Sequence, residues 1–350
     1  MPKSGNVVVD RYRCKDEAGC ASLRVPHAAF FKALLLAALI FWSPLGDAQA
    51  VIIETGDGTG NVTAPPDDPG WANLATRSNL TAVYLGRRWI LTANHVGAGN
   101  VVLEGQTYLP VPGSAIQFEN PDTSQADLMV FKIFGDPGLP RLEISSFPPV
   151  VGDSLIAIGN GLNRGSATTF MGLGGYNWGT GDAVRWGTNI VSEIDILVGT
   201  TYSFAATFTD PLDPSATADE AAGANGDSGG AAFIKVGGDW YLAGTIFAIS
   251  QYEGQPSTTS IYGNKLFAVD LSFYRDDILA VIEQKSCADG LDDDGDGFTD
   301  YPEDPECVSF SDDSELFPGV PALGLPGMLL LVALMLLGFS ARSRLLGKTN

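Results

Sequence analysis

Residues 223–230 read GANGDSGG, and this stretch decides how the rest of the chain is interpreted. Glycine clusters ordinarily mark turns and carry no chemistry of their own. A serine on a sharp turn can also be a nucleophile, provided that a base lies beside its hydroxyl. The stretch alone leaves both interpretations of Ser228 open, and the surrounding sequence must separate them.

Short apolar segments lie on both sides of this turn. They are rich in Val, Ile, Tyr, Phe and Thr and are bounded by Gly, Pro, Asn or Asp, which is typical of β-strands. The segments are TAVYLGRRWILTA (81–93), LMVFKIF (128–134), DSLIAIGNG (153–161), TYSFAATF (201–208), AAFIKV (231–236), WYLAGTIFAIS (240–250) and KLFAVDL (265–271). We therefore expect an all-β region, either a sandwich or barrels, with one helix at 272–284.

Composition limits the possible partners. The chain has 350 residues, 42 glycines and 21 prolines, which suit a loop-rich β protein, and a net charge of −21. Binding to nucleic acid relies on Lys and Arg, and we therefore do not expect a chain with this net negative charge to bind it.

The N-terminal region has the pattern of a secretory signal peptide. Lys32 precedes the apolar run ALLLAALIFW (33–42), and SPLG and AQA (48–50) follow. We expect residues 1–50 to be a signal peptide with an N-terminal extension, and cleavage after Ala50 to leave Val51 first. The protein would then be exported to the periplasm, the cell surface or the medium.

Cleavage at this point would leave few cysteines and histidines. Only Cys287 and Cys307 would remain, and an even pair in an exported protein predicts a disulfide. His27 would leave with the leader, so any histidine chemistry must use His95.

The C-terminal region carries a second apolar run, PGMLLLVALMLLGF (326–339), with a basic flank. Extended back to Val320, the run is long enough to cross a membrane, and we expect residues 320–350 to be a membrane anchor. A buried core helix is the alternative. The run and its flank also resemble bacterial C-terminal sorting signals, which a dedicated sorting protease cleaves or which remain as anchors.

Residues 286–310 form an acidic segment that we expect to be a separate loop closed by the disulfide, followed by a linker at 311–319. Five of its acidic residues have the spacing of an EF-hand-like calcium loop. They are Asp292, Asp294, Asp296, Asp300 and Glu303. A structural Ca²⁺ is the favoured interpretation, and a solvated acidic linker is the alternative.

Three residues carry the chemistry that Ser228 would need. RRWILTANHVGAG (87–99) places His95 at the end of an apolar segment, and QADLMVFKI (125–133) places Asp127 at the start of another. Histidine titrates near neutral pH and can accept the serine proton, and a carboxylate can orient the imidazole. Asp122 is the nearest alternative to Asp127.

With the order His, Asp, Ser in LTANHV, ADLMVF and GDSGG, the chain resembles the chymotrypsin-like (trypsin-type) serine proteases, including their bacterial members. The resemblance covers about residues 51–284. It implies two antiparallel six-stranded β-barrels at 51–148 and 149–285, the second with a C-terminal helix, and an active site between them. The resemblance also implies that catalysis needs no cofactor.

The resemblance also assigns binding positions. The backbone N–H groups of Gly226 and Ser228 would form the oxyanion hole. Ala222 would lie at the base of the specificity pocket, and Phe247, Ala248 and Ile249 would line its wall. Since alanine cannot pair with a cation, a preference for small or apolar substrate residues follows.

The family also suggests a means of activation. In it, a freed apolar N-terminus pairs with the aspartate before the serine, which is Asp227 here. Removal of the leader would expose Val51 and could itself activate the enzyme. Family cysteines are absent from the β region; Val96 and Ala224 stand at two of their places.

The sequence thus predicts a secreted or envelope-tethered serine endopeptidase that acts on proteins or peptides through an acyl-enzyme. Two alternatives remain: an esterase using the same three residues, and a non-catalytic calcium-dependent surface adhesin on a protease-like scaffold.

Overall fold

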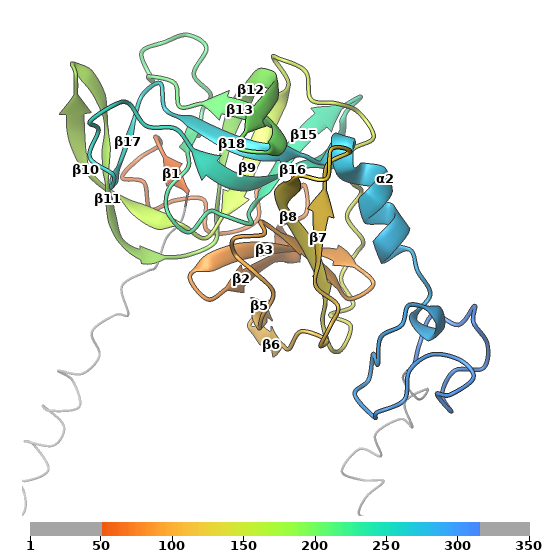
Figure 1. Cartoon of the computed structure of the whole chain (residues 1–350). Coiled ribbons are helices and arrows are strands. Elements are labelled where there is room, and N and C mark those ends of the chain that lie inside the picture. Colours follow the sequence, from red (N-terminus) through yellow and green to blue (C-terminus); the bar gives the residue numbers. More distant parts are fainter. Residues whose placement is uncertain (1–50, 316–350) are drawn as a thin grey trace, which may run out of the picture. The chain divides into compact units, whose positions relative to one another are not determined.

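The computed structural model describes residues 51–315, and Figure 1 shows their arrangement. The first half forms a seven-stranded antiparallel sheet in the order β6-β5-β2-β3-β4-β8-β7, one strand more than predicted. The 3-10 helix η1 (Trp71–Asn73) precedes it. Its strands are β2 (Leu74–Arg77), β3 (Leu80–Gly86), β4 (Trp89–Thr92), β5 (Val101–Leu103), β6 (Gln106–Tyr108), β7 (Ile116–Glu119) and β8 (Gln125–Lys132).

The second half closes into the predicted six-stranded antiparallel barrel, in the order β12-β13-β18-β16-β15-β9. Its strands are β9 (Ser154–Gly159), β12 (Arg185–Val198), β13 (Thr201–Thr207), β15 (Ala231–Val236), β16 (Asp239–Ile249) and β18 (Lys265–Asp270). The prediction of a mostly β chymotrypsin-like fold is confirmed.

Two small sheets flank this barrel. β1 (Ile52–Ile53) pairs with β14 (Ala221–Ala222), just before the glycine turn. β10 (Leu162–Phe170) and β11 (Leu173–Asp182) form a long hairpin, and β17 (Thr259–Ile261) pairs with β11. The sequence segments quoted above contained none of these strands.

The predicted helix is α2 (Leu271–Ile282). Asp270 caps its N-terminus, since its side chain accepts the Ser272 N–H at 2.9 Å. Its buried residues recur every three or four positions and form one face toward the protein. They are Leu271, Tyr274, Ile278 and Ile282.

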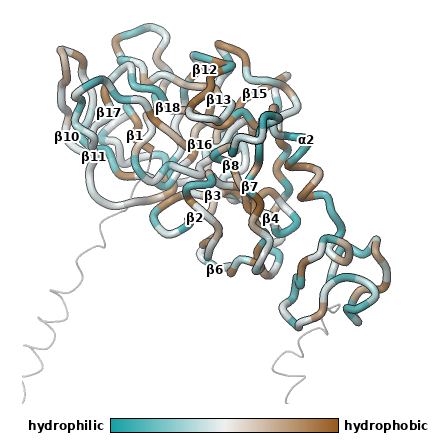
Figure 2. Tube along the Cα trace, viewed as in Figure 1, coloured by the Kyte–Doolittle hydropathy of each residue, from teal (hydrophilic) through white to brown (hydrophobic). Residues whose placement is uncertain are grey.

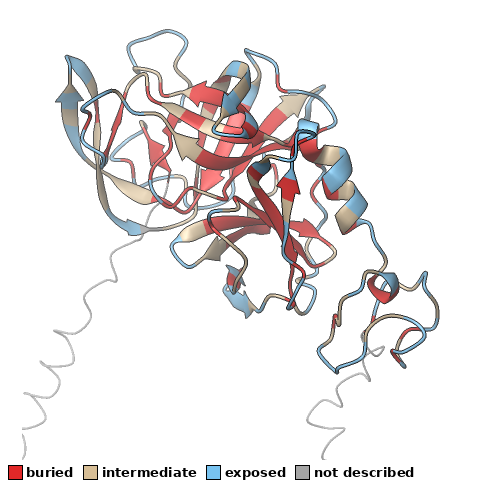
Figure 3. Cartoon of the chain, in the orientation of Figure 1, coloured by how far each residue is buried: buried red, intermediate tan, exposed pale blue. Residues whose placement is uncertain are grey.

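Many residues along the strands of both halves are apolar, as the colours of Figure 2 show, and many are buried, as those of Figure 3 show. The largest apolar cluster includes Leu91 and Leu128 of the first sheet, Phe233 of the barrel and Tyr274 of α2. It thus spans both halves and the helix, so the strands that carry the site share one core.

A turn that holds an arginine pair closes the β3–β4 hairpin. Arg87 and Arg88 have φ of 51° and 67°, as in a type I′ turn, a conformation that non-glycine residues adopt only with strain. Arg88 is nevertheless buried, and it donates to Asp293 of the acidic segment. This ion pair joins the hairpin to a region 205 residues away.

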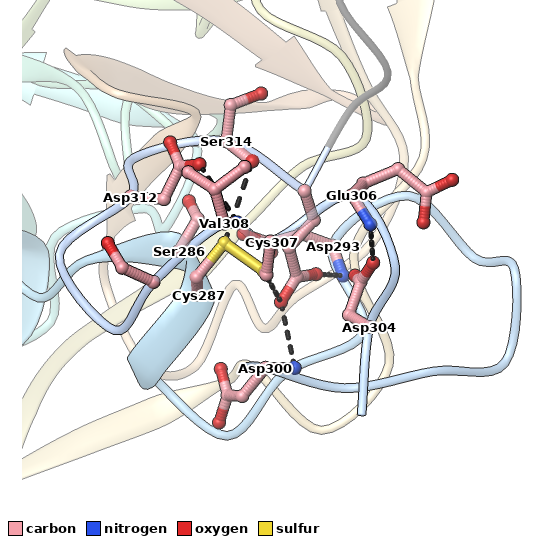
Figure 4. Close-up of a disulfide and its surroundings, with 12 residues drawn as sticks. Ser286, Cys287, Asp293, Asp300, Asp304, Glu306, Cys307, Val308, Asp312 and Ser314 are labelled. Atoms are coloured by element: carbon pink, nitrogen blue, oxygen red, sulfur yellow. Dashed lines mark hydrogen bonds between the residues drawn. A yellow bond between two sulfur atoms is a disulfide. The ribbon is translucent and has the colours of Figure 1, made fainter. Parts of the chain in front are cut away.

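The acidic segment, with the short η2 (Ser286–Ala288), folds into a compact module at residues 286–315 (Figure 4). The predicted disulfide between Cys287 and Cys307 is present. Residues 311–315, predicted as a linker, belong to the module: Asp312 accepts the Cys287 N–H, and Glu315 is fully buried.

The predicted signal peptide (1–50) and C-terminal anchor (320–350) lie outside the described residues. Between residues 51 and 315, no helix has the length and apolar character needed to cross a bilayer.

Candidate active site

His95 and Asp127 lie on neighbouring strands of the first sheet. His95 sits in the turn after β4, and Asp127 lies in β8, which pairs with β4. One Asp127 carboxylate oxygen accepts the His95 backbone N–H at 2.9 Å, and the other lies 2.7 Å from the ring Nδ1. The carboxylate therefore fixes both the backbone and the ring of His95.

The alternative carboxylate, Asp122, has a different role. It is exposed, and one of its oxygens accepts the backbone N–H of Ser124 at 3.0 Å and the Ser124 hydroxyl at 2.6 Å. These contacts close a turn before β8, so the structure places Asp127 beside the imidazole and not Asp122.

The pair shifts the pKa of each partner. The hydrogen bond from Asp127 raises the pKa of His95, although burial opposes the shift. Burial would raise the pKa of Asp127, but its bonds from the His95 ring and backbone outweigh burial and lower it. At neutral pH Asp127 is therefore ionised, and His95 titrates above its ordinary value of 6.5.

The turn that carries Ser228 is docked on the first sheet through Thr81 of β3. The Ser228 carbonyl accepts the Thr81 N–H at 2.9 Å. The Thr81 hydroxyl donates to the Gly226 carbonyl at 3.0 Å and accepts the Asn160 N–H at 2.8 Å. A side chain at residue 229 would collide with the Thr81 carbonyl, so this close approach requires Gly229.

Thr81 also connects the turn to the strand before His95. Its carbonyl accepts the hydroxyl of Thr92, the last residue of β4, at 2.9 Å. His95 follows three residues later. Within residues 51–315, no hydrogen bond joins the Ser228 hydroxyl to the His95 ring; such contacts are often long until substrate binds.

The backbone of the glycine turn leaves two donors available. Gly226 has a φ of 106°, and a β-carbon there would lie 2.6 Å from the Gly161 Cα, so only glycine fits. Among the hydrogen bonds of the described region, none uses the N–H of Gly226 or of Ser228. These are the two donors that the resemblance assigns to an oxyanion hole.

Asp227 is buried directly beneath the turn, with 1% of its surface exposed. Its carboxylate accepts the N–H of Gly161 at 2.9 Å and of Ala224 at 2.8 Å, and the Val51 N–H also donates to it. Burial raises the pKa of Asp227 to about 6, although these bonds and the charge of Arg185 act against it.

Sequence reasoning did not identify Arg185, which lies fully buried near Asp227. Its guanidinium donates to the Gly60 carbonyl at 2.6 Å and to the Val51 carbonyl at 3.2 Å. Burial lowers its pKa to about 10, and Asp227 opposes the shift. No local sequence signal distinguishes Arg185, the first residue of β12, from an exposed arginine, and only the tertiary fold shows that it is buried.

Two hollows flank the Ser228 turn. One, of about 420 Å³, contains His95, Asp127, Phe247 and Ala248 in its wall. The other, of about 300 Å³, is lined by residues before Ser228, including Asn225 and Gly226. The N–H of Gly229 donates to Ile246, next to Phe247, at 2.7 Å, so the turn adjoins both hollows.

The residues predicted to form the specificity pocket separate into two groups. Phe247 and Ala248 line the hollow beside His95. Ala222 is buried in the apolar cluster of Ile52, and Ile249 packs on Gly223: a β-carbon there would lie 2.7 Å from its Cγ2. The Ile249 side chain thus occupies space next to the residue that follows Ala222.

The predicted metal residues also separate. Carboxylate oxygens of Asp292, Asp294 and Asp296 lie within 4.8 Å of one another. Asp300 instead accepts the backbone N–H groups of residues 289 and 290, and Glu303 is exposed. The structure therefore brings together three of the five predicted ligands.

The fold and the His95–Asp127 pair define the class of chymotrypsin-like serine proteases. Comparison with known families gives the particular family: the trypsin family matches residues 58–265, and the chain belongs to it.

Among solved structures, the chain is similar to neuropsin, a serine protease expressed in the limbic system of mouse brain. The two are 17% identical, with a TM-score of 0.42, over 63% of this chain and 97% of neuropsin. No curated protein matches the sequence.

Proposed function

We propose that the protein is an exported serine endopeptidase in which Ser228 is the nucleophile, His95 the general base and Asp127 the group that orients it. The observation that carries this proposal is the double contact of Asp127 with His95. Because Asp127 accepts a hydrogen from Nδ1, the Nε2 atom of a neutral ring has a free lone pair for the serine proton.

The reaction has two balanced halves. Ser228 Oγ attacks the peptide carbonyl while its proton passes to His95, and His95 returns this proton to the departing amine as the C–N bond breaks. Water then attacks the acyl group on Ser228, giving its proton to His95, which returns it to Ser228 Oγ as the ester bond breaks. The N–H groups of Gly226 and Ser228 stabilise the oxyanion in both halves.

Leader removal would complete this site. Val51 is fully buried and its N–H already donates to Asp227. Cleavage before Val51 would replace that amide by an ammonium ion next to a buried carboxylate. The charge pair would favour ionised Asp227 and fix the turn that presents the two oxyanion donors.

The substrate residue before the cleaved bond would be small and uncharged. Ile249 lies against Gly223, and the nearby Ala222 offers no charge. We expect the variant Ile249→Gly to favour larger residues over alanine by about 10–200-fold relative to the parent, within the range for changes in an apolar pocket. Cleavage of a peptide library would measure the change, and an unchanged profile would exclude this role of Ile249.

Export and anchoring rest on the sequence. The apolar run at 33–42 would direct secretion, and the segment 320–350 would anchor the enzyme in the envelope or be removed by a sorting protease. Fractionation of cells that express the full chain, and of cells that express a chain ending at residue 315, tests both. A chain that remains in the cytoplasm would exclude export.

The decisive experiment is labelling with a fluorophosphonate, followed by peptide mapping. We expect label on Ser228, loss of label in Ser228→Ala and His95→Ala, and full label in Ser215→Ala, which removes an exposed serine. An unlabelled folded protein would support the adhesin alternative. Labelling with cleavage of esters but not of library peptides would support the esterase.

A further inference from the structure

We propose that Arg185 is a positioning residue for peptide hydrolysis: it holds the Val51 carbonyl so that the nitrogen of Val51 meets Asp227, and its charge stabilises the turn that presents the oxyanion donors. The inference rests on the proposed function and deepens it. Arg185 is present before and after leader removal, so it would fix the place that the new N-terminus takes, whereas cleavage supplies only the ammonium ion.

The first observation is the complete burial of Arg185. It is the first residue of β12, and none of its surface is exposed. Its Nε donates to the Gly60 carbonyl at 2.6 Å and its Nη1 to the Val51 carbonyl at 3.2 Å. Carbonyl oxygens satisfy N–H donors but carry no full charge. Since arginine is almost never fully buried unless it is paired, a carboxylate is expected near the guanidinium.

The strand register places Asp227 at this point. In the antiparallel pair of β9 and β12, Arg185 lies directly opposite Gly159. Side chains of directly opposed residues lie on one face of a sheet, with their β-carbons about 4.5–5.5 Å apart. Gly159 has no side chain, and a β-carbon there would collide with Oδ1 of Asp227. The Asp227 carboxylate therefore occupies the place of the cross-strand partner of Arg185.

Val51 connects the two charged residues through its backbone. Its N–H donates to Asp227, and its carbonyl accepts from Arg185. Val51 has a φ of 42°, a conformation that is rare for a β-branched residue. Such a conformation persists only where the surroundings impose it. The two side chains, one on each side of the residue, impose it here and aim the nitrogen of Val51 at Asp227.

Asp227 transmits this arrangement to the oxyanion donors. It stands between Gly226 and Ser228, and its carboxylate accepts the N–H groups of Gly161 and Ala224. An ionised carboxylate accepts these bonds more strongly than a protonated one. Arg185 opposes the effect of burial on the pKa of Asp227 and so favours the ionised form. Arg185 thus acts on the turn through Asp227 and Val51, and not by contact with substrate.

Arg164 provides an internal comparison. It donates to the carbonyls of Ile53 and Glu54 at 2.9 and 2.6 Å, and it lies over the Tyr176 ring at 4.4 Å from the centroid. It therefore holds the same N-terminal segment as Arg185, but two and three residues after Val51. A role in docking this segment is common to both arginines, whereas the contact with Val51 belongs to Arg185.

The kinetic test compares three variants of the exported protein on a peptide ester. Arg185→Gln, which keeps a donor and loses the charge, should lower kcat by about 10²–10³-fold, as for the loss of one oxyanion donor. KM should stay within about threefold, because Arg185 does not bind substrate. Arg185→Lys restores the charge and should recover at least about tenfold of the lost kcat. Arg164→Gln is the control and should stay within about threefold of the parent.

Alkylation of His95 counts the folded sites in each variant, because His95 lies in the other half of the molecule. Equal losses of kcat in Arg185→Gln and Arg164→Gln would assign the effect to docking of the segment and overturn the proposal. So would a higher KM with unchanged kcat, or an Arg185→Lys variant no more active than Arg185→Gln.

A second measurement does not use catalysis. Urea unfolding of Ser228→Ala at about pH 8, where Asp227 is ionised, gives the cost of Arg185→Gln with and without Asp227→Asn. Measured as the fall in the folding equilibrium constant, this cost should be at least about tenfold smaller with Asp227→Asn, because the two charges are paired. Equal costs would overturn the proposal. A parent that cleaves nothing would refute the peptidase function, while this cycle would still decide the role of Arg185.

Failure to fold is itself informative in this cycle. An Arg185→Gln variant that folds only together with Asp227→Asn would show the pairing directly. Failure in both backgrounds would show that Arg185 supports the fold alone, and would overturn its role in positioning.

Discussion

The surroundings of Asp127 and of Asp227 shift the pKa of a carboxyl group in opposite directions. Asp127 is part-exposed and bonded to His95, and its pKa is lowered. Asp227 is fully buried among backbone N–H groups, and its pKa is raised to about 6. A single strong partner near solvent lowers the pKa of a carboxyl group, whereas burial among mostly neutral donors raises it. The first arrangement holds a permanent charge on Asp127, and the second leaves the ionised form of Asp227 open to stabilisation by an added positive charge.

The change with the largest expected effect acts on the permanent charge. Asp127→Asn removes it and favours the wrong tautomer of His95, so kcat should fall by about 10⁴-fold. Asp122→Asn is the control, because Asp122 only closes a turn, and it should retain full activity. Rates on a peptide ester substrate measure both. Equal losses in the two variants would mean that Asp127 has no special role.

A smaller loss is expected on the Asp227 side. In Asp227→Asn one oxygen is replaced by a donor that faces the N–H of Gly161 or Ala224, which disturbs the turn and its oxyanion donors. Because one such donor is worth about 10²–10³-fold, kcat should fall by that amount while labelling of His95 by alkylating agents stays normal. Addition of one residue before Val51 should have the same effect. Full activity in either variant would refute activation through Asp227.

The pH dependence of the free energy of unfolding should further distinguish Asp127 from Asp227. In a chain that retains residues before Val51, the pKa of Asp227 rises from 3.8 to about 6. Its contribution to the free energy of unfolding is therefore fully present below pH 3.8 and is lost as the pH rises through about 6. The loss is on the order of 3 kcal/mol.

Urea unfolding of Ser228→Ala, with and without Asp227→Asn, measures this contribution as the difference between the two curves. The opposite sign is expected for Asp127, whose contribution is present at neutral pH and lost as the pH falls through its lowered pKa. A pH-independent difference for Asp227 would show that the protein environment does not raise its pKa.

The smallest effect concerns the pH profile of the reaction. His95 must be neutral to accept the serine proton, and Asp127 raises its pKa, so kcat/KM should rise with pH to a midpoint above 6.5. In Asp127→Asn the residual activity should reach its midpoint at lower pH. A midpoint that does not move would assign the acidic limb to another group.

Local sequence patterns predicted much of this structure because the relevant signals are short-range. Apolar segments marked eight strands, β3, β4, β8, β9, β13, β15, β16 and β18, and apolar spacing marked α2. The segments did not include β12 of the barrel or the short strands β2, β5, β6 and β7. The β10–β11 hairpin escaped because its side chains are mostly part-exposed and its segment is rich in glycine and polar residues. Such strands are stabilised by cross-strand pairing, which no single segment reveals.

In the candidate site too, short sequence signals predicted some residues, whereas others required the tertiary fold. His95, Asp127 and Ser228 stand in recognisable segments, and the choice between Asp127 and Asp122 required the register of β4 against β8. The burial of Arg185 depends on a chain path that spacing does not encode. An EF-hand register assumes a regular loop, and the Cys287–Cys307 module has another path.

The threonine at position 81 has a consequence for biosynthesis. The turn of Ser228 is supported by a residue that belongs to the other half of the molecule, through its N–H and its hydroxyl. A nascent chain in which only one half has folded therefore lacks a formed nucleophilic turn. With Ser228 as the proposed nucleophile, hydrolytic power would arise only after both halves have associated, and unfinished copies of the protein would not cut one another.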